Sequence, residues 1–361
     1  MLVLGIESSC DETSCALVRD GKEIICNYVA SQEDLHQKYG GVIPELACRR
    51  HIDSLPSLFR KSLCCTSEEI DLIAVTKGPG LIGALLVGLN FAKGLSLSLG
   101  KPLVGINHVE AHLYAVLMEH SPVFPALGVV ISGGHTALVK VQGVGNYQLI
   151  GQTQDDAIGE AFDKVAKILH LPYPGGPQIE KLAQQGDPHS YRFKCGQVKG
   201  RPFDLSYSGL KTAVLYTVKG QNASKEAPFL IHDHQKADIA AAFQYAAFST
   251  LVEKIQLAAK HYRCHSIILG GGVSQNRYLR TLLEKTSDVP VFWPPSGLSL
   301  DNAAMIAGLG FHTFLQKGAD TLDLEPLTRI PFMNVPKENY EKSPSAASLA
   351  IAVEPECLRG T

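Results

Sequence analysis

Several common signatures are missing from this chain, and each absence excludes a class of protein. The nine cysteines are scattered and form no CxxC pair, which predicts reduced thiols rather than a disulfide framework. The GxxxxGK[ST] phosphate loop is absent, which excludes a P-loop NTPase. Neither sign of charge is in excess, with 33 basic and 35 acidic residues. This balance argues against a non-specific nucleic-acid coat but allows a local basic face for one RNA.

Targeting signals are also lacking. The segment MLVLGIESSCDE has no basic residues and meets acidic residues by position 11, unlike a secretion signal or a mitochondrial transit peptide. The longest apolar stretch, Leu81 to Leu99, includes Asn90, Lys93 and several glycines, so we expect a buried helix rather than a membrane span. The sequence therefore predicts a cytoplasmic protein without a membrane partner.

Strand-like and helical segments alternate along the chain, which predicts an α/β protein. A length of 361 residues favours two domains. A three-strand meander fills residues 2–30, and a second fills residues 125–151, each opening with an apolar strand and a tight polar turn. We therefore expect two related α/β halves that face each other.

The same rhythm suggests boundaries. The expected segments are an N-terminal lobe (1–124), a second lobe (125–300) with a polar insertion at about 187–235, a C-terminal helix (301–336) that packs back on the lobes, and a disordered tail (337–361).

Two glycine turns suit a phosphate or a nucleotide. In the turn Ile131–Thr136, glycines let backbone amides approach an anion, and the Ser132 hydroxyl can donate. The turn Gly270–Asn276 follows an apolar strand and opens a helix, a junction that suits a nucleotide. Simple chain reversal explains either turn alone, but both together in a two-lobed protein favour ligand binding.

A third glycine turn, Gly78–Gly83, matches GxGxxG but predicts no dinucleotide site. The strand that follows ends in Asn107 and His108 rather than in an acidic residue for a ribose. The polar turn at Glu7–Ser14 is acidic instead. Beside a phosphate, Asp11 and Glu12 need a metal ion or a donor between them, and a solvent-facing turn is the alternative.

The stretch GINHVEAHLYA places His108 and His112 on one face of a predicted helix. Neutral imidazoles at this spacing can chelate Zn²⁺ or Fe²⁺, with Asp301 as a third ligand at the start of a later helix. Ordinary packing of two histidines is the alternative. A metalloprotease is disfavoured because Glu110 does not directly follow His108, as the HExxH arrangement requires.

Ten motifs occur in the order found in the TsaD family, which this chain resembles from residue 3 to about 310. The motifs are GIESSCDETS, GGVIPELACRRH, GPGLIGALLVG, NHVEAH, ISGGHT, GEAFDKVAK, YPGGP, YSGLKTA, GGGVSQNRYLR and DNAAMIA. The resemblance implies a two-lobed actin/Hsp70-like (ASKHA) fold with duplicated RNase H-like halves. It also implies transfer of a threonylcarbamoyl group from threonylcarbamoyl-AMP to N6 of adenosine 37 in tRNAs that read ANN codons, which forms t6A.

The resemblance further assigns residues. It implies one divalent metal per subunit, Fe²⁺ first and Zn²⁺ second, on His108, His112 and Asp301. For threonylcarbamoyl-AMP it implies a pocket of Ile131, Ser132, Gly133, Gly134, His135, Asp163, Gly176, Glu180 and Asn276. Asp11, Glu12 and Ser132 are expected to take part in catalysis, the carboxylates as acceptors of the N6 proton and Ser132 as a donor to the developing oxyanion.

Partners follow from the same resemblance: a tRNA anticodon loop, a TsaB-like paralogue and a TsaE-like ATPase. Within the predicted insertion, cations alternate with aromatic residues, which suits RNA phosphates and stacked bases. These residues are Tyr191–Lys194, Lys199, Arg201, Phe203, Tyr207 and Lys211. Two other functions stay open, an actin-like kinase or ATPase and a nucleotide-gated scaffold.

Overall fold

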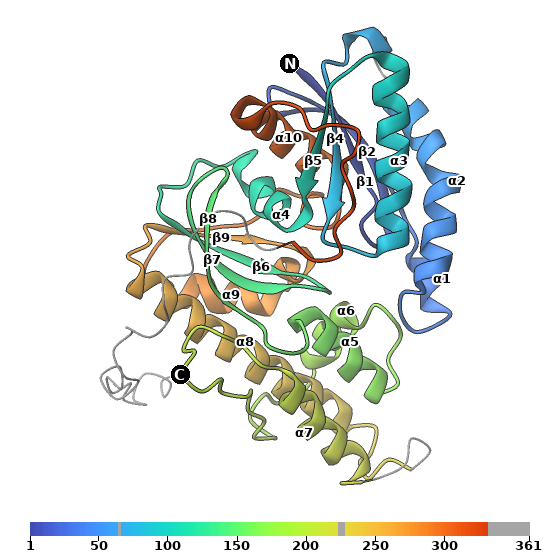
Figure 1. Cartoon of the computed structure of the whole chain (residues 1–361). Coiled ribbons are helices and arrows are strands. Elements are labelled where there is room, and N and C mark those ends of the chain that lie inside the picture. Colours follow the sequence, from blue (N-terminus) through green and yellow to red (C-terminus); the bar gives the residue numbers. More distant parts are fainter. Residues whose placement is uncertain (64–65, 223–227, 331–361) are drawn as a thin grey trace.

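A computed structural model describes residues 1–63, 66–222 and 228–330 of the chain (Figure 1). The predicted tail at 337–361 and the end of the segment before it lie outside these residues.

The first half is built on a five-stranded sheet. Its strands are β1 (Leu2–Glu7), β2 (Glu12–Arg19), β3 (Glu23–Ser31), β4 (Leu72–Gly78) and β5 (Leu103–Asn107). They lie in the order β3-β2-β1-β4-β5. The meander β1–β3 is antiparallel, whereas β4 and β5 add to β1 in parallel.

A second sheet repeats this topology. Its strands are β6 (Ala126–Ile131), β7 (Thr136–Gly143), β8 (Asn146–Gln152), β9 (Ser266–Gly270) and β10 (Val291–Phe292). They lie in the order β10-β9-β6-β7-β8, again an antiparallel meander with two parallel strands added to its first strand. The predicted duplication is therefore confirmed, and the short β10 is an additional strand that the sequence did not predict.

Helices cover the outer face of each sheet. On the first sheet, α2 (Pro44–Ser62) and α3 (Ile82–Leu99) pack against the strands, and Pro44 occupies the first turn, where its missing N–H costs nothing. On the second sheet lie α5 (Ile158–Ile168) and α8 (Gln235–His261). The remaining helices outside the centre are α1 (Glu33–Gln37), α6 (Gly175–Ala183), α7 (Ser208–Lys219), α9 (Arg277–Thr286) and the short 3₁₀ helices at Ser67–Glu69 and Gly272–Gln275.

Two helices between the sheets are exchanged between the halves. Helix α4 (His108–Leu117) ends the first half but packs on β6 and β9 of the second sheet, while α10 (Ala303–Lys317) packs on β1, β2 and β4 of the first. The two helices also pack on each other, and Figure 1 shows α4 between the two sheets. The exchange brings the start of α4 and the start of α10 to the same place.

Helix α3 departs from the sequence prediction. Its inner face is buried, but only 28% of its apolar window is, and among the described helices it is the one long and apolar enough to cross a membrane. Ile82, Leu86 and Leu97 are all exposed. The prediction of a buried helix is therefore wrong for the outer face of α3, because α2 covers only part of that face.

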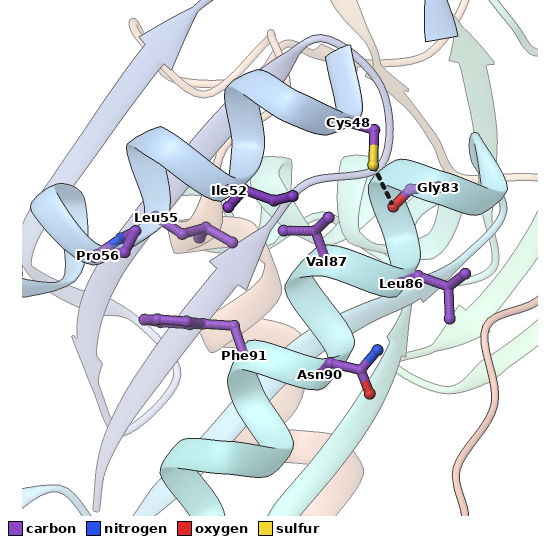
Figure 2. A pocket seen from close by; sticks show the side chains of 9 residues that line it. All are labelled: Cys48, Ile52, Leu55, Pro56, Gly83, Leu86, Val87, Asn90 and Phe91. Carbon is purple, nitrogen blue, oxygen red and sulfur yellow. Dashed lines mark hydrogen bonds between the residues drawn. The ribbon is translucent and has the colours of Figure 1, made fainter. Parts of the chain in front are cut away.

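Between α2 and α3 lies an apolar groove of about 450 Å³ (Figure 2). The Cys48 thiol donates to the Gly83 carbonyl at one end of it, and Ile52 and Leu86 are among its exposed residues. The groove is lined by Cys48, Ile52, Leu55, Pro56, Gly83, Leu86, Val87, Asn90 and Phe91.

Candidate active site and metal centre

The histidine helix begins at the end of a buried parallel strand. Asn107 ends β5 and caps α4, because its side-chain oxygen accepts from the backbone N–H of Val109 at 2.9 Å. His108 is therefore the first residue of α4 and His112 lies one turn later, both buried. The cap fixes where the helix starts, and so it fixes the direction of both imidazoles.

The third predicted ligand reaches the same point from the second half. Asp301 directly precedes Asn302, which caps α10 through the backbone N–H of Met305. The Asp301 Oδ1 atom lies 3.4 Å from Nε2 of His108 and 3.1 Å from Nε2 of His112. The structure thus brings His108, His112 and Asp301 together, with one ligand atom from each lying within 4.8 Å of the others.

The two distances from the Asp301 oxygen suit a divalent cation. Ligand atoms about 2.1 Å from a metal lie about 3.0 Å apart at octahedral angles and about 3.4 Å apart at tetrahedral angles. Despite its closeness to Asp301, Nε2 of His112 makes no hydrogen bond of acceptable geometry with any residue that the structure describes, and neither does Nδ1. Buried nitrogen atoms rarely lack a hydrogen-bond partner. A ring nitrogen that points at a position shared with other ligand atoms, rather than directly at one of them, lacks a partner in this way. Two imidazoles and one carboxylate also form a donor set that Fe²⁺ and Zn²⁺ accept.

Electrostatic interactions within this cluster favour the ionised form of Asp301. Burial opposes ionisation of Asp301, but the neighbouring His108 holds the pKa of that carboxyl well below its usual range. The pKa of His135, from the opposite glycine turn, is lowered as well. Burial, followed by the electrostatic effect of His108 and His112, lowers it to about 4, so that His135 is neutral at pH 7.

The acidic turn after β1 lies beside this cluster. Burial, followed by the charges of Asp301 and Asp11, raises the pKa of Glu12 to about 10. Without a compensating cation Glu12 therefore carries a proton at pH 7. This result restricts its predicted role as a proton acceptor to a site in which positive charge offsets Asp301.

Sequence reasoning missed His51, which fastens the acidic turn to α2. Its Nε2–H donates to the Cys10 carbonyl at 3.0 Å, and its Nδ1 accepts from the Thr13 hydroxyl at 2.8 Å. The backbone N–H of Leu81 donates to the Ser9 carbonyl, so that the N-terminus of α3 holds the turn as well. A single histidine on a helix gives no sequence pattern that could have indicated this contact.

Sequence reasoning also missed Glu7, the last residue of β1. Its carboxylate is fully buried and accepts from Nδ1 of His108 at 3.0 Å. Burial favours the neutral form, but the charge and hydrogen bond of His108 lower the pKa of Glu7 below its ordinary value. The sequence held one signal. Side chains alternate along a strand, so Glu7 lies on the same inward face as Val3 although the rest of the strand is apolar.

The glycine turn at 132–135 faces open space. A Cβ added to Gly133 or Gly134 would meet nothing within 4 Å. The turn itself is closed by two hydrogen bonds, from Ser132 N–H to the His135 carbonyl and from His135 N–H to the Ser132 hydroxyl. Gly159 supports it from behind, since a Cβ there would lie 2.6 Å from the Ser132 carbonyl oxygen. The fold therefore holds a turn whose outer side is free for a ligand.

The residues predicted to bind the nucleoside include two carboxylates that cap the N-termini of helices. The Asp163 carboxylate accepts from the Gly175 N–H at 2.7 Å, while Gly176 has nothing within 4 Å of an added Cβ. Burial raises the pKa of Asp163 to about 6. Glu180 accepts from the backbone N–H of Arg277 at 2.7 Å.

Asn276 is more engaged than the sequence predicts. Its oxygen caps α9 through Leu279 N–H, and its amide donates to Gln244 at 3.1 Å. One amide hydrogen remains for a ligand. A cavity of about 240 Å³ opens beside this group, lined by Glu180, Ala183, Gln184, Gln244, Arg277, Tyr278 and Thr281.

The GxGxxG turn at Gly78 is closed by the fold. The Leu327 N–H donates to the Lys77 carbonyl, and a Cβ on Gly78 would collide with the Leu327 carbonyl. On the other side, Gly80 packs against the Ser9 backbone. These glycines serve close backbone packing.

The predicted basic and aromatic surface is wrong in part. Phe203 and Tyr207 are buried in the core of the second half, with 8% and 0% of their surface exposed. Lys211 pairs with Asp156 at 2.6 Å. Part of the insertion folds as α7, and the apolar face of this helix packs in the same core as Phe203 and Tyr207. These two aromatic side chains are therefore unavailable for stacking with RNA bases.

Comparisons with known proteins support the family that the sequence motifs indicate. The family model described as tRNA N6-adenosine threonylcarbamoyltransferase matches residues 23–308. A protein of that name from Protochlamydia amoebophila is 61% identical, over 93% of this chain and 99% of its own. One from Chlamydia muridarum is 53% identical, over 91% and 97% respectively.

Solved structures bear on the fold alone. Full-length HypF in its phosphate- and nucleotide-bound form has a TM-score of 0.57 at 12% identity, over 88% of this chain and 47% of that one. HypF from T. kodakarensis has a TM-score of 0.55 at 14% identity, over 90% and 48% respectively. The expected two-lobed ASKHA-type fold is confirmed. From the family match, and from relatives that share more than half of its residues over nearly its full length, this chain belongs to the TsaD family of tRNA N6-adenosine threonylcarbamoyltransferases.

Proposed function

We propose that this protein transfers the threonylcarbamoyl group of threonylcarbamoyl-AMP to N6 of adenosine 37 in tRNAs that read ANN codons, with release of AMP. The observation that carries the proposal is the convergence of His108, His112 and Asp301 beside the open glycine turn. Family membership supports the reaction class.

The chemistry calls for positioning. The donor is a mixed anhydride, so AMP leaves readily, whereas the exocyclic amine of adenine is a weak nucleophile because its lone pair is delocalised into the ring. N6 forms a bond to the carbamoyl carbon, the bond from that carbon to the AMP oxygen breaks, and N6 loses a proton. A site that aligns the two substrates lowers most of the barrier.

The metal-ligand cluster supplies the electrophilic end of this site. One divalent cation per subunit, Fe²⁺ first and Zn²⁺ second, would be held by His108, His112 and Asp301 and would supply Lewis-acid polarisation of the threonylcarbamoyl group. The backbone of Gly133 and Gly134 and the hydroxyl of Ser132 would donate to the oxygen that gains charge. Ile131 and His135 hold the two ends of that turn, and neutral His135 adds no competing charge.

The remaining predicted residues would hold the nucleotide and accept the proton. Asp163 and Glu180, each of which accepts from a backbone N–H at a helix N-terminus, would also accept hydrogen bonds from ribose hydroxyls, and Gly176 and Asn276 would line the same pocket. Asp11 would accept the N6 proton, because Glu12, with a pKa of about 10, already carries a proton at pH 7. Glu12 joins it only where a cation offsets the charge of Asp301.

Partners and location are part of the same proposal. We infer a cytoplasmic protein that works on the anticodon loop of tRNA together with a TsaB-like paralogue and a TsaE-like ATPase. The exposed apolar groove between α2 and α3 supports a protein partner (Figure 2), since contiguous apolar surface of this kind is typical of interfaces.

The test is nucleoside mass analysis of unmodified ANN-decoding tRNA after incubation with the protein and preformed threonylcarbamoyl-AMP. The reaction is run in extract depleted of the endogenous enzyme, so that partners are present. We expect a threonylcarbamoyl mass increment on adenosine that is lost in the His108→Ala/His112→Ala protein. An increment that survives in that control would refute the metal assignment. No increment with wild-type protein that binds nucleotide would favour a kinase or a scaffold.

A further inference from the structure

A buried carboxylate stands directly behind the metal-ligand cluster and belongs to none of the predicted roles. Glu7 has 0% of its surface exposed, and each of its oxygens is bonded. Oε1 accepts from the Ser9 N–H, while Oε2 accepts from the Thr76 hydroxyl at 2.6 Å and from Nδ1 of His108 at 3.0 Å. An ionised carboxylate is costly to bury, so three donors at one such group indicate a maintained position.

The strand explains why Glu7 points at the cluster. Side chains alternate along β1, so that Leu4 and Ile6 face α2 and α3, while Val3, Gly5 and Glu7 face α10. Gly5 has no side chain, and a Cβ there would collide with the Ala303 carbonyl at the start of α10. The loop that carries Asp301 therefore comes close to β1 just where Glu7 ends the strand.

The two histidines differ in what holds them. His108 has Glu7 on Nδ1, with the Ser9 hydroxyl at 3.3 Å as a second neighbour, and its Nε2 faces Asp301. His112 has no hydrogen-bond partner on either nitrogen. A histidine that binds a metal through one nitrogen commonly donates the N–H of the other to a carboxylate, which fixes its tautomer and ring orientation. Only His108 has such a partner among the described residues.

We propose that Glu7 is the positioning residue of the metal centre: it accepts the Nδ1–H of His108 and so keeps Nε2 free of a proton and aimed at the point shared with His112 and Asp301. The inference rests on the metal site of the proposed function. Glu7 itself binds no metal, because its oxygens are occupied by the three donors.

The first measurement needs no substitution. Protein labelled with ¹⁵N in its histidines is loaded with Zn²⁺, and two-bond ¹H–¹⁵N spectra report which ring nitrogen of His108 carries the proton. We expect Nδ1 to be protonated and Nε2 to be metal-bound. Protonation of Nε2, with Zn²⁺ bound elsewhere, would overturn the role of Glu7.

The second measurement compares Zn²⁺ affinity by competition with a chelator. Glu7→Gln keeps the size of the side chain but removes the charge, and we expect about 10- to 100-fold weaker binding. The matched control is Thr76→Val, which removes a different donor from the same carboxylate and leaves the contact with His108. Its affinity is expected to stay within about threefold of wild type.

The outcomes separate the two proposals. Zn²⁺ affinity unchanged in a Glu7→Gln protein with a wild-type melting temperature would refute the positioning role and leave the metal site intact. Failure of the wild-type protein to bind Zn²⁺ or Fe²⁺ at all would refute the metal part of the proposed function together with this inference. If Glu7→Gln does not fold, the spectrum of the wild-type protein decides.

Discussion

The turn after β1 and the turn after β6 occupy equivalent places in the two halves, yet their chemistry is opposite. Glu7 pairs with Ser14 at the last register position of the first meander, as Ile131 pairs with Thr136 in the second. The first turn carries Asp11 and Glu12, whereas the second consists of Ser132, two glycines and His135. The two halves therefore present turns of opposite character at equivalent positions: the first carries carboxylates, whereas the second offers backbone N–H groups and a hydroxyl.

A shared feature marks the equivalence. The Ser14 hydroxyl accepts from the backbone N–H of Ala303 at the start of α10, and the Thr136 hydroxyl accepts from that of Ile158 at the start of α5. Each half thus uses the first residues of its second strand to hold a helix N-terminus. The scaffold was kept while the loops diverged.

Substitution of His112, the proposed metal ligand that has no hydrogen-bond partner among the described residues, gives the largest expected effect. His112→Ala should abolish stoichiometric metal binding and lower the transfer rate by about 10³-fold, since Lewis-acid activation contributes several kcal/mol. Metal content by mass spectrometry and nucleoside analysis measure the two effects. Exposed His265→Ala is the control, and a fully active, metal-free His112→Ala protein would contradict the assignment.

Two substitutions test whether the outer side of the glycine turn is free. Each adds one methyl group, the first within the turn and the second behind it. Gly133→Ala places a Cβ in open space, so we expect an unchanged melting temperature and an increase in KM for the donor of about 10-fold, from overpacking of the ligand. Gly159→Ala places a Cβ against the Ser132 carbonyl and should cost about 1–3 kcal/mol of unfolding free energy instead. Equal effects of the two variants on KM and stability would refute a free outer side.

The affinity of the site for the nucleoside should depend on pH. The pKa of Asp163 is about 6 because of burial, and only the ionised carboxylate is a full acceptor for ribose hydroxyls. Affinity for adenosine, which does not itself titrate in this range, should therefore fall as the pH decreases from 7 to 5. Asp163→Asn should bind adenosine about 10-fold more weakly at pH 7.5 and lose the pH dependence; calorimetry checks both, and an unaltered pH profile in the variant would exclude Asp163 as the cause.

The helix-holding hydroxyls give the smallest effect. Ser14→Ala and Thr136→Val each remove the acceptor of one helix N–H, and each should cost about 1 kcal/mol of unfolding free energy in urea. Costs that differ by severalfold would show that the two positions are no longer equivalent in energy.

The sequence predicted the sheets well because each meander shows its own alternation of apolar and polar residues. It also predicted the approach of His108 and His112, since their spacing alone puts them on one helix face. It could not predict the exchange of α4 and α10, which depends on packing between distant segments, nor His51, one of many polar residues on α2. Glu7 left one signal, its place on the inward face of an apolar strand. Phe203 and Tyr207 were misread because aromatic residues in an irregular segment look alike whether they form core or surface.

The exchange of α4 and α10 has a consequence for how the chain folds. Each sheet is covered on its inner face by the last helix of the other half, which is the arrangement of a domain-swapped homodimer within a single chain. A half on its own would expose the apolar face that the other half's helix covers. Neither half is therefore expected to fold as an independent unit, and the ligand cluster lies where the two exchanged helices start.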